Sequence, residues 1–164
     1  MSSKKGAPQQ REGAPHLKLV TKNRRATFDY LVESKVECGI ALLGTEVKSL
    51  RAGQAQLSDS YALGQRGELY LFNAQIPPYA PAGPLQNHDP KRTRKLLLRR
   101  REIDKLLEAQ QKAGYALVPL SLYFKDGKVK LELAIAKGKD GADKRDAIAA
   151  REAKREINRA IRRK

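Results

Sequence analysis

The densest run of chemically active side chains lies at residues 91–101, which read KRTRKLLLRRR. Seven of these eleven residues are Lys or Arg, and none is acidic. So many like charges repel one another unless an anion neutralises them, and phosphate is the natural partner of ammonium and guanidinium groups. The alternative is a solvated helix face, although ordinary protein surfaces mix both signs of charge. The run therefore predicts contact with phosphate through Lys91, Arg92, Arg94 and Lys95.

Lys48 and Arg51 form a second candidate site, within the stretch GTEVKSLRAG. On a helix, a spacing of three residues places both side chains on one face, where they can touch adjacent phosphates. The same stretch is equally consistent with a helix that packs Val47 inward and leaves Glu46 in an exposed salt bridge. The spacing alone does not decide between these two interpretations.

Two smaller basic clusters are weaker candidates for contact with a polyanion. Lys128 and Lys130 alternate along one strand face, a pattern that also keeps exposed strands soluble. Asn23, Arg24 and Arg25 are consecutive, and this cluster is equally compatible with a simple turn.

The side chains that could support catalysis form no recognisable constellation. His88 and Asp89 are adjacent, but such a pair at a helix start is more often a cap than a catalytic dyad. Cys38 falls on an apolar strand face and is expected in the core. The sequence shows no nucleophile motif, nucleotide-binding loop or paired-carboxylate metal motif. We therefore expect a protein that is not an enzyme and that uses no cofactor or metal.

The overall charge points to a polyanionic partner. The chain has 164 residues and a formal net charge of +16, from 34 Lys and Arg against 18 Asp and Glu. Nucleic acid is the first candidate partner and an anionic membrane the second. No helix-turn-helix or zinc-finger pattern is present, which favours RNA over duplex DNA. No apolar run approaches the roughly 18 residues of a membrane helix, and no signal peptide is visible. A single cysteine fits a reducing cytoplasm.

The elements that would position these side chains are mainly strands. Period-two alternation predicts strands at residues 26–32 and 35–42, and a hairpin around the loop at residues 64–67. A second hairpin is predicted across residues 117–136, with Asp126-Gly127 as a type I′ turn.

Two helices are predicted between these strands. The first spans Glu46 to Ala52, with Thr45 as its cap. The second starts at Asp89-Pro90 and runs towards Gly114, with a break near Arg99. The free backbone N–H groups after Asp89 would be a further anion site.

Together these elements predict a mainly β (α+β) fold, a small closed or partly closed antiparallel barrel with two or three packed helices, and barrels of this kind often bind oligonucleotides. The expected organisation is a disordered N-terminal arm at residues 1–16, an RNA-binding barrel domain at 17–138 and a basic C-terminal tail at 139–164. From Lys139 onward there are ten basic and five acidic residues, a net charge of +5. Several alanines favour a helix, but a helix this short is marginal in water by itself. A partner that neutralises its charge would favour the helical form.

Several stretches together resemble the SsrA-binding protein family, also known as small protein B. They occur in the family's order and cover nearly the whole chain from about Leu17. They are NRRA (23–26), ECGIALLGTEVKSLRAG (37–53), SDSY (58–61), NHDPKRTRKLLL (87–98), VPLSLYFKDGKVKLELAIAKGK (118–139) and DKR (143–145).

The resemblance implies a bacterial protein with a small antiparallel oligonucleotide-binding-like β-barrel and helices packed on it. Such a protein binds the tRNA-like domain of transfer-messenger RNA. It would deliver that RNA to stalled ribosomes for trans-translation, in which the incomplete protein is tagged and the ribosome is released. Elongation factor Tu and alanyl-tRNA synthetase are further partners implied through the shared RNA. The alternative is a general ribosomal or structured-RNA-binding module without this selectivity.

The resemblance also implies residue roles. It places RNA contact on Asn23, Arg25, Glu37, Lys48, Arg51, Arg92, Arg94 and Lys95. Glu37 is informative because a carboxylate repels phosphate, so it would accept hydrogen bonds from base or ribose donors or hold a basic neighbour.

For the tail, the resemblance implies a segment that is unstructured in the free protein. It becomes helical in the empty mRNA path of the ribosome, at the decoding centre. The residues expected to engage the ribosome are Lys139, Asp143, Lys144, Arg145, Arg151, Arg155, Ile157, Arg159 and Ile161.

Overall fold

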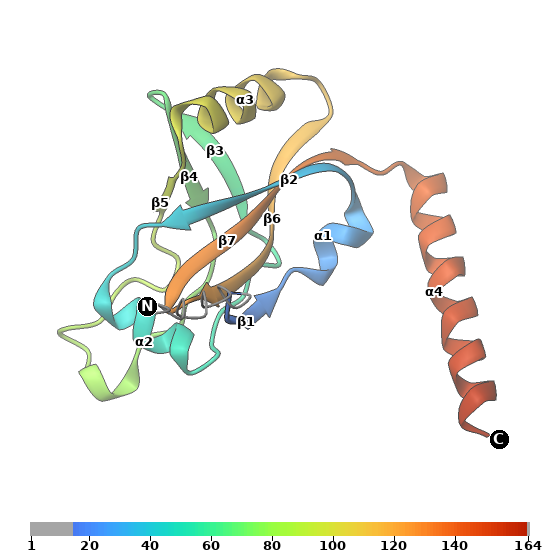
Figure 1. The fold of residues 1–164 in the computed structure, drawn as a ribbon, viewed down its shortest axis with the longest axis horizontal. Coiled ribbons are helices and arrows are strands. Elements are labelled where there is room, and N and C mark those ends of the chain that lie inside the picture. The colour runs from blue at the N-terminus through green and yellow to red at the C-terminus, as the bar shows by residue number, and fades with distance from the viewer. Residues whose placement is uncertain (1–14, 164) are drawn as a thin grey trace, which may run out of the picture.

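A long hairpin, β6 (Tyr115–Lys125) and β7 (Lys128–Gly138), organises the computed structural model, which describes residues 15–163. All seven strands join one antiparallel sheet in the order β1-β6-β3-β4-β5-β2-β7 (Figure 1). The remaining strands are β1 (Leu17–Lys22), β2 (Tyr30–Ile40), β3 (Tyr61–Gln65), β4 (Glu68–Phe72) and β5 (Arg94–Leu97). The helices are α1 (Arg24–Asp29), α2 (Gly44–Arg51), α3 (Arg100–Gln111) and α4 (Gly141–Arg162), with a short 3₁₀ helix at Ala80–Ala82.

The sheet closes on itself through β6. One edge of β6 pairs with β7 along its whole length, and β7 pairs in turn with β2. The other edge is shared, because β3 pairs with it near Leu117 and β1 pairs with it from Ser121 to Lys125. This closure confirms the predicted small antiparallel barrel, in which no central strand is left with an unpaired edge.

The barrel core follows the predicted alternation of apolar residues. Leu131 and Leu133 on β7 are fully buried, and Cys38 on β2 lies in the same core, as expected. The β6–β7 turn uses Asp126 at φ 49° and Gly127 at φ 79°, which matches the predicted type I′ geometry. Strands β3 and β4 also pair as an antiparallel hairpin, with Gln65 opposite Glu68, so both predicted hairpins are confirmed.

The helix predicted from Asp89-Pro90 is wrong in its first half. Residues 94–97 form strand β5, which pairs with both β2 and β4, and the helix begins only at Arg100. Leu96 is fully buried and Leu97 is half exposed, so this segment alternates with the period of a strand. Asp89 Oδ1 accepts a hydrogen bond from the Lys91 N–H inside a loop. The anion site expected at a helix start here does not exist.

Two local predictions near the other helices also need correction. Residues 26–29, predicted as strand, lie in α1, because the Asn23 side chain caps this helix by accepting from the Ala26 N–H at 3.2 Å. Thr45 does not cap α2, which begins one residue earlier at Gly44. The Thr45 hydroxyl is instead hydrogen-bonded to His88 Nδ1 at 2.9 Å.

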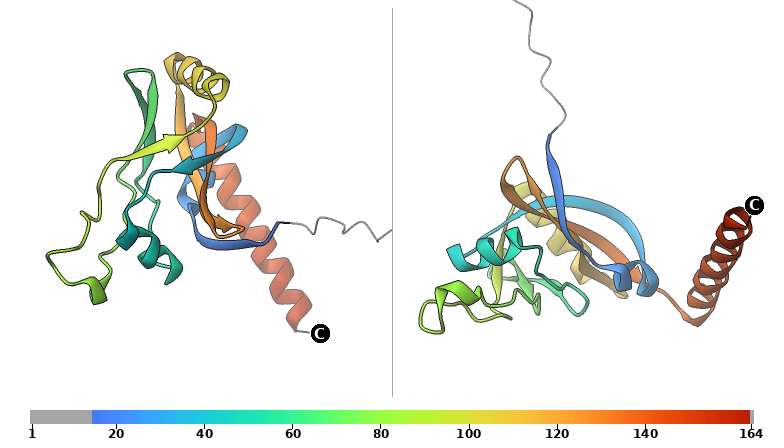
Figure 2. Two further views of the ribbon diagram at one scale, coloured as in Figure 1. Left: turned by 60° about the vertical axis from the view of Figure 1, so that its left-hand side comes forward. Right: turned by 90° about the horizontal axis from the view of Figure 1, so that it is seen from below.

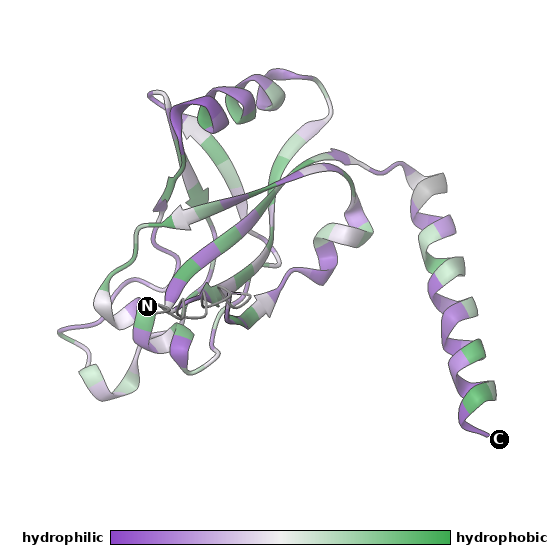
Figure 3. Ribbon diagram, in the orientation of Figure 1, coloured by the Kyte–Doolittle hydropathy of each residue, from purple (hydrophilic) through white to green (hydrophobic). Residues whose placement is uncertain are grey.

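Helix α4 extends away from the barrel, as Figure 2 shows from two further directions. Its surface mixes polar residues with short apolar bands (Figure 3), and Ile157 and Ile161 are 60% and 68% exposed. The structure shows the helical form of the tail, and its disorder in the free protein stays a prediction. The expected N-terminal arm lies largely outside the described residues. Within residues 15–163, no helix is long and apolar enough to cross a membrane.

Candidate nucleic-acid interface

A buried charge cluster supports the surface that carries Lys48 and Arg51. Glu46 projects from the inner face of α2 and has no exposed surface. One carboxylate oxygen accepts hydrogen bonds from Arg92 Nε at 2.9 Å and Nη2 at 2.6 Å, while the other accepts from Arg94 Nε. Arg94 also donates to the Ala74 and Pro90 carbonyl oxygens at 2.7 and 3.2 Å. The cluster therefore ties α2 to β5 and to the loop before it.

This cluster corrects the expected role of Arg94. Its side chain is fully buried, so it cannot touch RNA while the ion pair with Glu46 holds. Arg92 is one-third exposed and shares the same carboxylate, so it is partly available to a ligand. The exposed salt bridge considered for Glu46 is likewise wrong, because its carboxylate lies inside the fold. A buried carboxylate needs such partners, since an unpaired charge in the interior is strongly unfavourable.

The outer face of α2 and the loops beside it form an exposed basic surface. Lys48 and Arg51 both point to solvent, and Lys48 Nζ lies 5.6 Å from the ring centroid of Tyr79 in a cation–π contact. Lys91 is exposed and lines a small polar hollow of about 110 Å³ with Asn73 and neighbouring residues. Helix α2 therefore combines features of both interpretations given above, because its inner face packs against the barrel and its outer face presents exposed basic residues.

Glu37 lies on the outside of the barrel within a hydrogen-bonded cluster. The Tyr123 hydroxyl donates to one carboxylate oxygen, and Lys125 Nζ lies 3.1 Å from the other. The Tyr123 hydrogen bond is the main cause that lowers the pKa of Glu37, although partial burial opposes it. Burial and the hydrogen bond to Glu37 together raise the pKa of Tyr123. Lys130 lies opposite Tyr123 in the β6–β7 register, so these groups share one surface.

A shallow groove of about 620 Å³ runs from this cluster towards the start of α3. It combines two carboxylates, two cations and apolar surface, including Leu97, which is 51% exposed. Such a mixture can accept hydrogen bonds from bases, attract phosphates and contact apolar base faces. The lining residues are Glu37, Gly39, Leu97, Leu98, Arg99, Glu102 and Lys130.

The sequence did not nominate Tyr123, Lys125 or Leu97 for this surface. Tyr123 and Lys125 alternate on the polar side of a predicted strand, and that signal could have identified them. Leu97 is the middle one of three consecutive leucines and falls within the predicted helix, so the expected helical period did not indicate its exposure.

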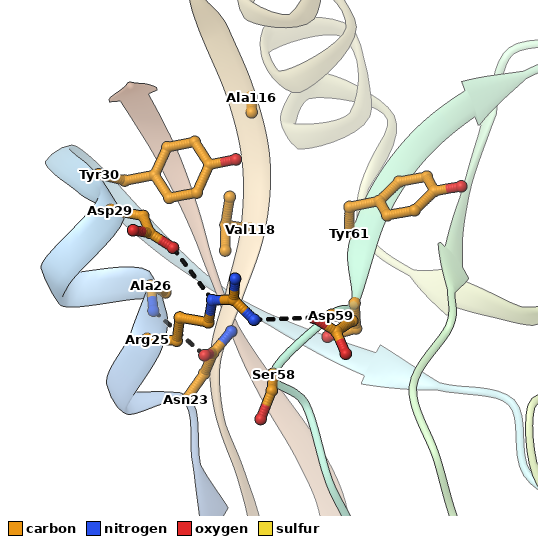
Figure 4. Close-up of a pocket in the computed structure, with 11 residues that line it drawn as sticks. Asn23, Arg25, Ala26, Asp29, Tyr30, Ser58, Asp59, Tyr61, Ala116 and Val118 are labelled. Atoms are coloured by element: carbon orange, nitrogen blue, oxygen red, sulfur yellow. Dashed lines mark hydrogen bonds and ion pairs between the residues drawn. The ribbon is translucent and has the colours of Figure 1, made fainter. Parts of the chain in front are cut away.

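Asn23 has a structural role. Its amide donates to the Leu57 and Pro119 carbonyl oxygens at 3.2 and 2.9 Å, and its oxygen caps α1. The side chain is almost fully buried, which corrects the expectation of direct RNA contact. Arg25 is exposed and lies between two carboxylates, Asp29 at 3.3 Å and Asp59 at 3.2 Å (Figure 4).

The other predicted residues are distributed over the surface. Arg24 and Lys128 are exposed, and Lys95 is half exposed at 4.0 Å from Glu68. On the tail, Lys139 Nζ donates to the Thr27 carbonyl oxygen at 3.0 Å. Lys144 Nζ is 3.6 Å from Asp29, and the Asp143 side chain lies outside the described part of the chain. Among the tail residues predicted to engage the ribosome, those that are exposed are Arg145, Arg151, Arg155, Ile157, Arg159 and Ile161.

Comparison of the sequence with known proteins shows which family the chain belongs to. Residues 20–163 match the family model described as SmpB protein. The chain belongs to the SmpB family. This SmpB family chain is 56% identical over 144 residues to the SsrA-binding protein of Acidothermus cellulolyticus, an alignment that covers 88% of this chain and 90% of that protein. It is 54% identical to the SsrA-binding protein of Thermobifida fusca, with 90% and 91% covered.

A solved structure supports the same assignment. It is described as "tmRNA-SmpB: a journey to the center of the bacterial ribosome". The matching chain is 46% identical, with a TM-score of 0.65, and the match covers 78% of this chain and 93% of that one. The SmpB family match begins within β1 and includes all of α4, so both the groove and the helical tail lie inside the matched region.

Proposed function

We propose that this chain binds the tRNA-like domain of transfer-messenger RNA and delivers it to stalled ribosomes for trans-translation. The observation that carries this function is the SmpB family match across residues 20–163. The structural neighbour, described as tmRNA-SmpB in the bacterial ribosome, supports the same partner and the same place of action. Action on ribosomes supports a cytoplasmic location.

The barrel would provide the RNA-binding surface. Lys48, Arg51 and Lys91 are exposed cations that can contact the phosphate backbone without first breaking an internal ion pair. Glu37 can accept hydrogen bonds from a base or ribose, because its low pKa keeps the carboxylate ionised at neutral pH. Phosphate contacts would set the position of the RNA, and the Glu37 groove would read its local structure.

The tail would act separately, in the vacant mRNA path of the ribosome. Its side chains from Arg151 to Arg163 are all exposed along α4, so most of its surface is available to ribosomal RNA. Its excess of basic residues suits a channel lined by phosphates. The helical shape of α4 supports entry of the tail as a helix.

The protein would act as a carrier and would not catalyse a reaction. His88 is buried, with Nε2 donating to the Ile76 carbonyl oxygen at 2.8 Å and Nδ1 bonded to Thr45. Burial raises the pKa of the Cys38 thiol to about 12, so it holds no reactive thiolate at neutral pH. These placements favour structural roles for both residues. Within residues 15–163, no group of three or more His, Cys, Asp and Glu could hold a metal ion.

A reconstituted translation reaction tests this function. Ribosomes translating an mRNA without a stop codon are supplied with alanylated transfer-messenger RNA and elongation factor Tu, with or without the protein. The expected result is tag addition and release of the stalled ribosome only when the protein is present. Absence of tagging with fully active RNA and ribosomes would overturn the proposed function.

A further inference from the structure

A basic cleft lies where the tail meets the barrel. It has a volume of about 590 Å³ and lies between the end of β1, helix α1 and helix α4. Five of its seven lining residues carry a positive charge, and none carries a negative charge. The lining residues are Lys22, Arg24, Arg25, Thr27, Phe28, Arg151 and Arg155.

Three contacts place the tail beside α1 and so create this cleft. Lys139 Nζ donates to the Thr27 carbonyl oxygen at 3.0 Å, and Lys144 Nζ lies 3.6 Å from Asp29. About two helical turns beyond Lys144, the Arg151 guanidinium lies 5.6 Å from the ring centroid of Phe28. Figure 1 shows α4 on the same side of the molecule as α1, and these three contacts join the two helices.

The cations of this cleft are poorly compensated by the protein. Arg25 has two carboxylate partners, Asp29 and Asp59. In the described part of the chain, no carboxylate lies within 4.0 Å of the charged groups of Lys22, Arg24, Arg151 or Arg155. Four cations around one open volume repel each other, and this repulsion opposes docking of the tail.

We propose that the cleft binds a phosphodiester group of RNA, which bridges α1 to α4 and holds the tail against the barrel. Arginine suits this role because its planar guanidinium can donate two parallel hydrogen bonds to one phosphate. Arg151 and Arg155 are four residues apart and share one helix face, so both can reach the same ligand from the tail. Arg24 and Lys22 would contact the ligand from the barrel side.

The bound phosphate would control the position of the tail. Without it, repulsion between the two sides weakens docking, and α4 samples other orientations. With it, the direction of α4 relative to the barrel becomes fixed. The inference rests on the proposed function, since RNA is the expected ligand, but it requires only the RNA backbone and no tRNA-like structure.

A spin-label experiment on the full chain tests this proposal. The native Cys38 is buried and its thiol pKa is raised to about 12, so a cysteine introduced as Ala153→Cys takes up the label selectively. Position 153 is exposed and lies two residues from both Arg151 and Arg155, which points it away from their face of the helix. A nitroxide there broadens the amide NMR signals of α1 when the tail is docked. Adding a short oligouridylate should increase the broadening at Thr27 and Phe28.

Two double variants that remove the same charge distinguish specific binding of oligouridylate in the cleft from its general electrostatic attraction to the basic tail. Arg151→Ala with Arg155→Ala should raise the oligouridylate concentration needed for half-maximal broadening by at least about fivefold. The slope of the logarithm of oligouridylate affinity against the logarithm of salt concentration should become shallower by about 0.7 for each lost phosphate contact. Arg162→Ala with Arg163→Ala removes the same charge from the end of the tail, outside the cleft lining, and should change that concentration less than about twofold.

Two results would overturn the proposal. One is α1 broadening that oligouridylate leaves unchanged, and the other is an equal loss in both double variants. Neither result would affect binding of the tRNA-like domain, which is measured separately, so failure here is distinguishable from failure of the proposed function. Inorganic phosphate, tested alone, should produce the same docking at higher concentration if the phosphate group itself is recognised.

Discussion

The arginines beneath α2 and those on α4 have the same chemistry and opposite surroundings. Arg94 is fully buried against Glu46, and each of its three guanidinium nitrogens donates a hydrogen bond to a protein acceptor. Arg159 and Arg162 on α4 are exposed, and no carboxylate partners them in the described chain. The first group stabilises the fold, while the second is available to an external anion. A count of basic residues therefore indicates the class of partner, but burial decides which of them can bind it.

Removing helix α4, which carries the exposed arginines, should have the largest effect on tagging activity. Ending the chain before Asp143 should abolish tagging on stalled ribosomes, because α4 would no longer enter the mRNA path. Affinity for the tRNA-like domain should stay within roughly threefold, since exposed charge contacts contribute little individually. Tagging assays and equilibrium binding check both expectations. A truncated protein that tags normally, or one that tags but loses RNA affinity, would contradict the separation of the two regions.

Breaking the buried ion pair between Glu46 and Arg94 should instead lower the stability of the fold. Glu46→Gln keeps the shape of the side chain but leaves the Arg94 charge without a counter-ion in the interior. The free energy of unfolding should fall by about 3–5 kcal/mol, measured by urea denaturation. Glu156→Gln, on the exposed helix, is the matched control and should change stability by less than about 0.5 kcal/mol. A loss below about 1 kcal/mol for Glu46→Gln would show that the buried pair is not required.

The exposed face of α2 should affect RNA binding and leave stability almost unchanged. Lys48→Ala with Arg51→Ala removes two expected phosphate contacts, so affinity for the tRNA-like domain should fall about tenfold, with a logarithmic salt slope lower by about 1.8. Binding isotherms at several salt concentrations measure both quantities. Unchanged affinity would exclude this face from the interface.

The Glu37–Tyr123 pair should give the smallest effect, and it should depend on pH. The Tyr123 hydroxyl lowers the pKa of Glu37 below its ordinary 4.5, so the hydrogen bond stabilises the fold at neutral pH. This contribution is lost as pH falls below about 4.5 and the carboxyl is protonated. Tyr123→Phe should therefore reduce stability by about 1 kcal/mol or less at pH 7, because the pair is partly solvent-screened.

Denaturation of wild type and Tyr123→Phe across the acidic range measures this dependence. The two curves of unfolding free energy against pH should converge as the pH falls below 4.5, the ordinary pKa of a glutamate. A difference that stays constant across this range would mean that packing, and not the ionised carboxylate, explains the effect.

Local sequence patterns were sufficient to predict the barrel hairpins. Alternation placed Cys38 and Leu131 in the core, and Asp126-Gly127 identified a turn whose geometry the structure reproduces. The Asp89-Pro90 pair favoured a helix start, but pairing of Leu96 with Ile40 across β2 and β5 determined a strand instead. Tertiary pairing overrode a local signal.

The functional surface was predictable only in part, because its contacts are distant in the sequence. Arg94 and Glu46 are separated by 48 positions, and Tyr123 and Glu37 by 86, so neither pair shows a local pattern. Charge density identified the basic residues of both regions. It could not distinguish Arg94, which is enclosed by the fold, from Lys91 three residues earlier, which faces solvent.

Selective recognition of RNA tests the central claim most directly. Affinity of the full chain for the tRNA-like domain of transfer-messenger RNA is measured beside that for an elongator tRNA of similar length at moderate salt. We predict a preference of at least about tenfold, equivalent to about 1.4 kcal/mol, for the tRNA-like domain. Equal affinities with a steep salt dependence would contradict the account and would indicate a general RNA-binding module instead.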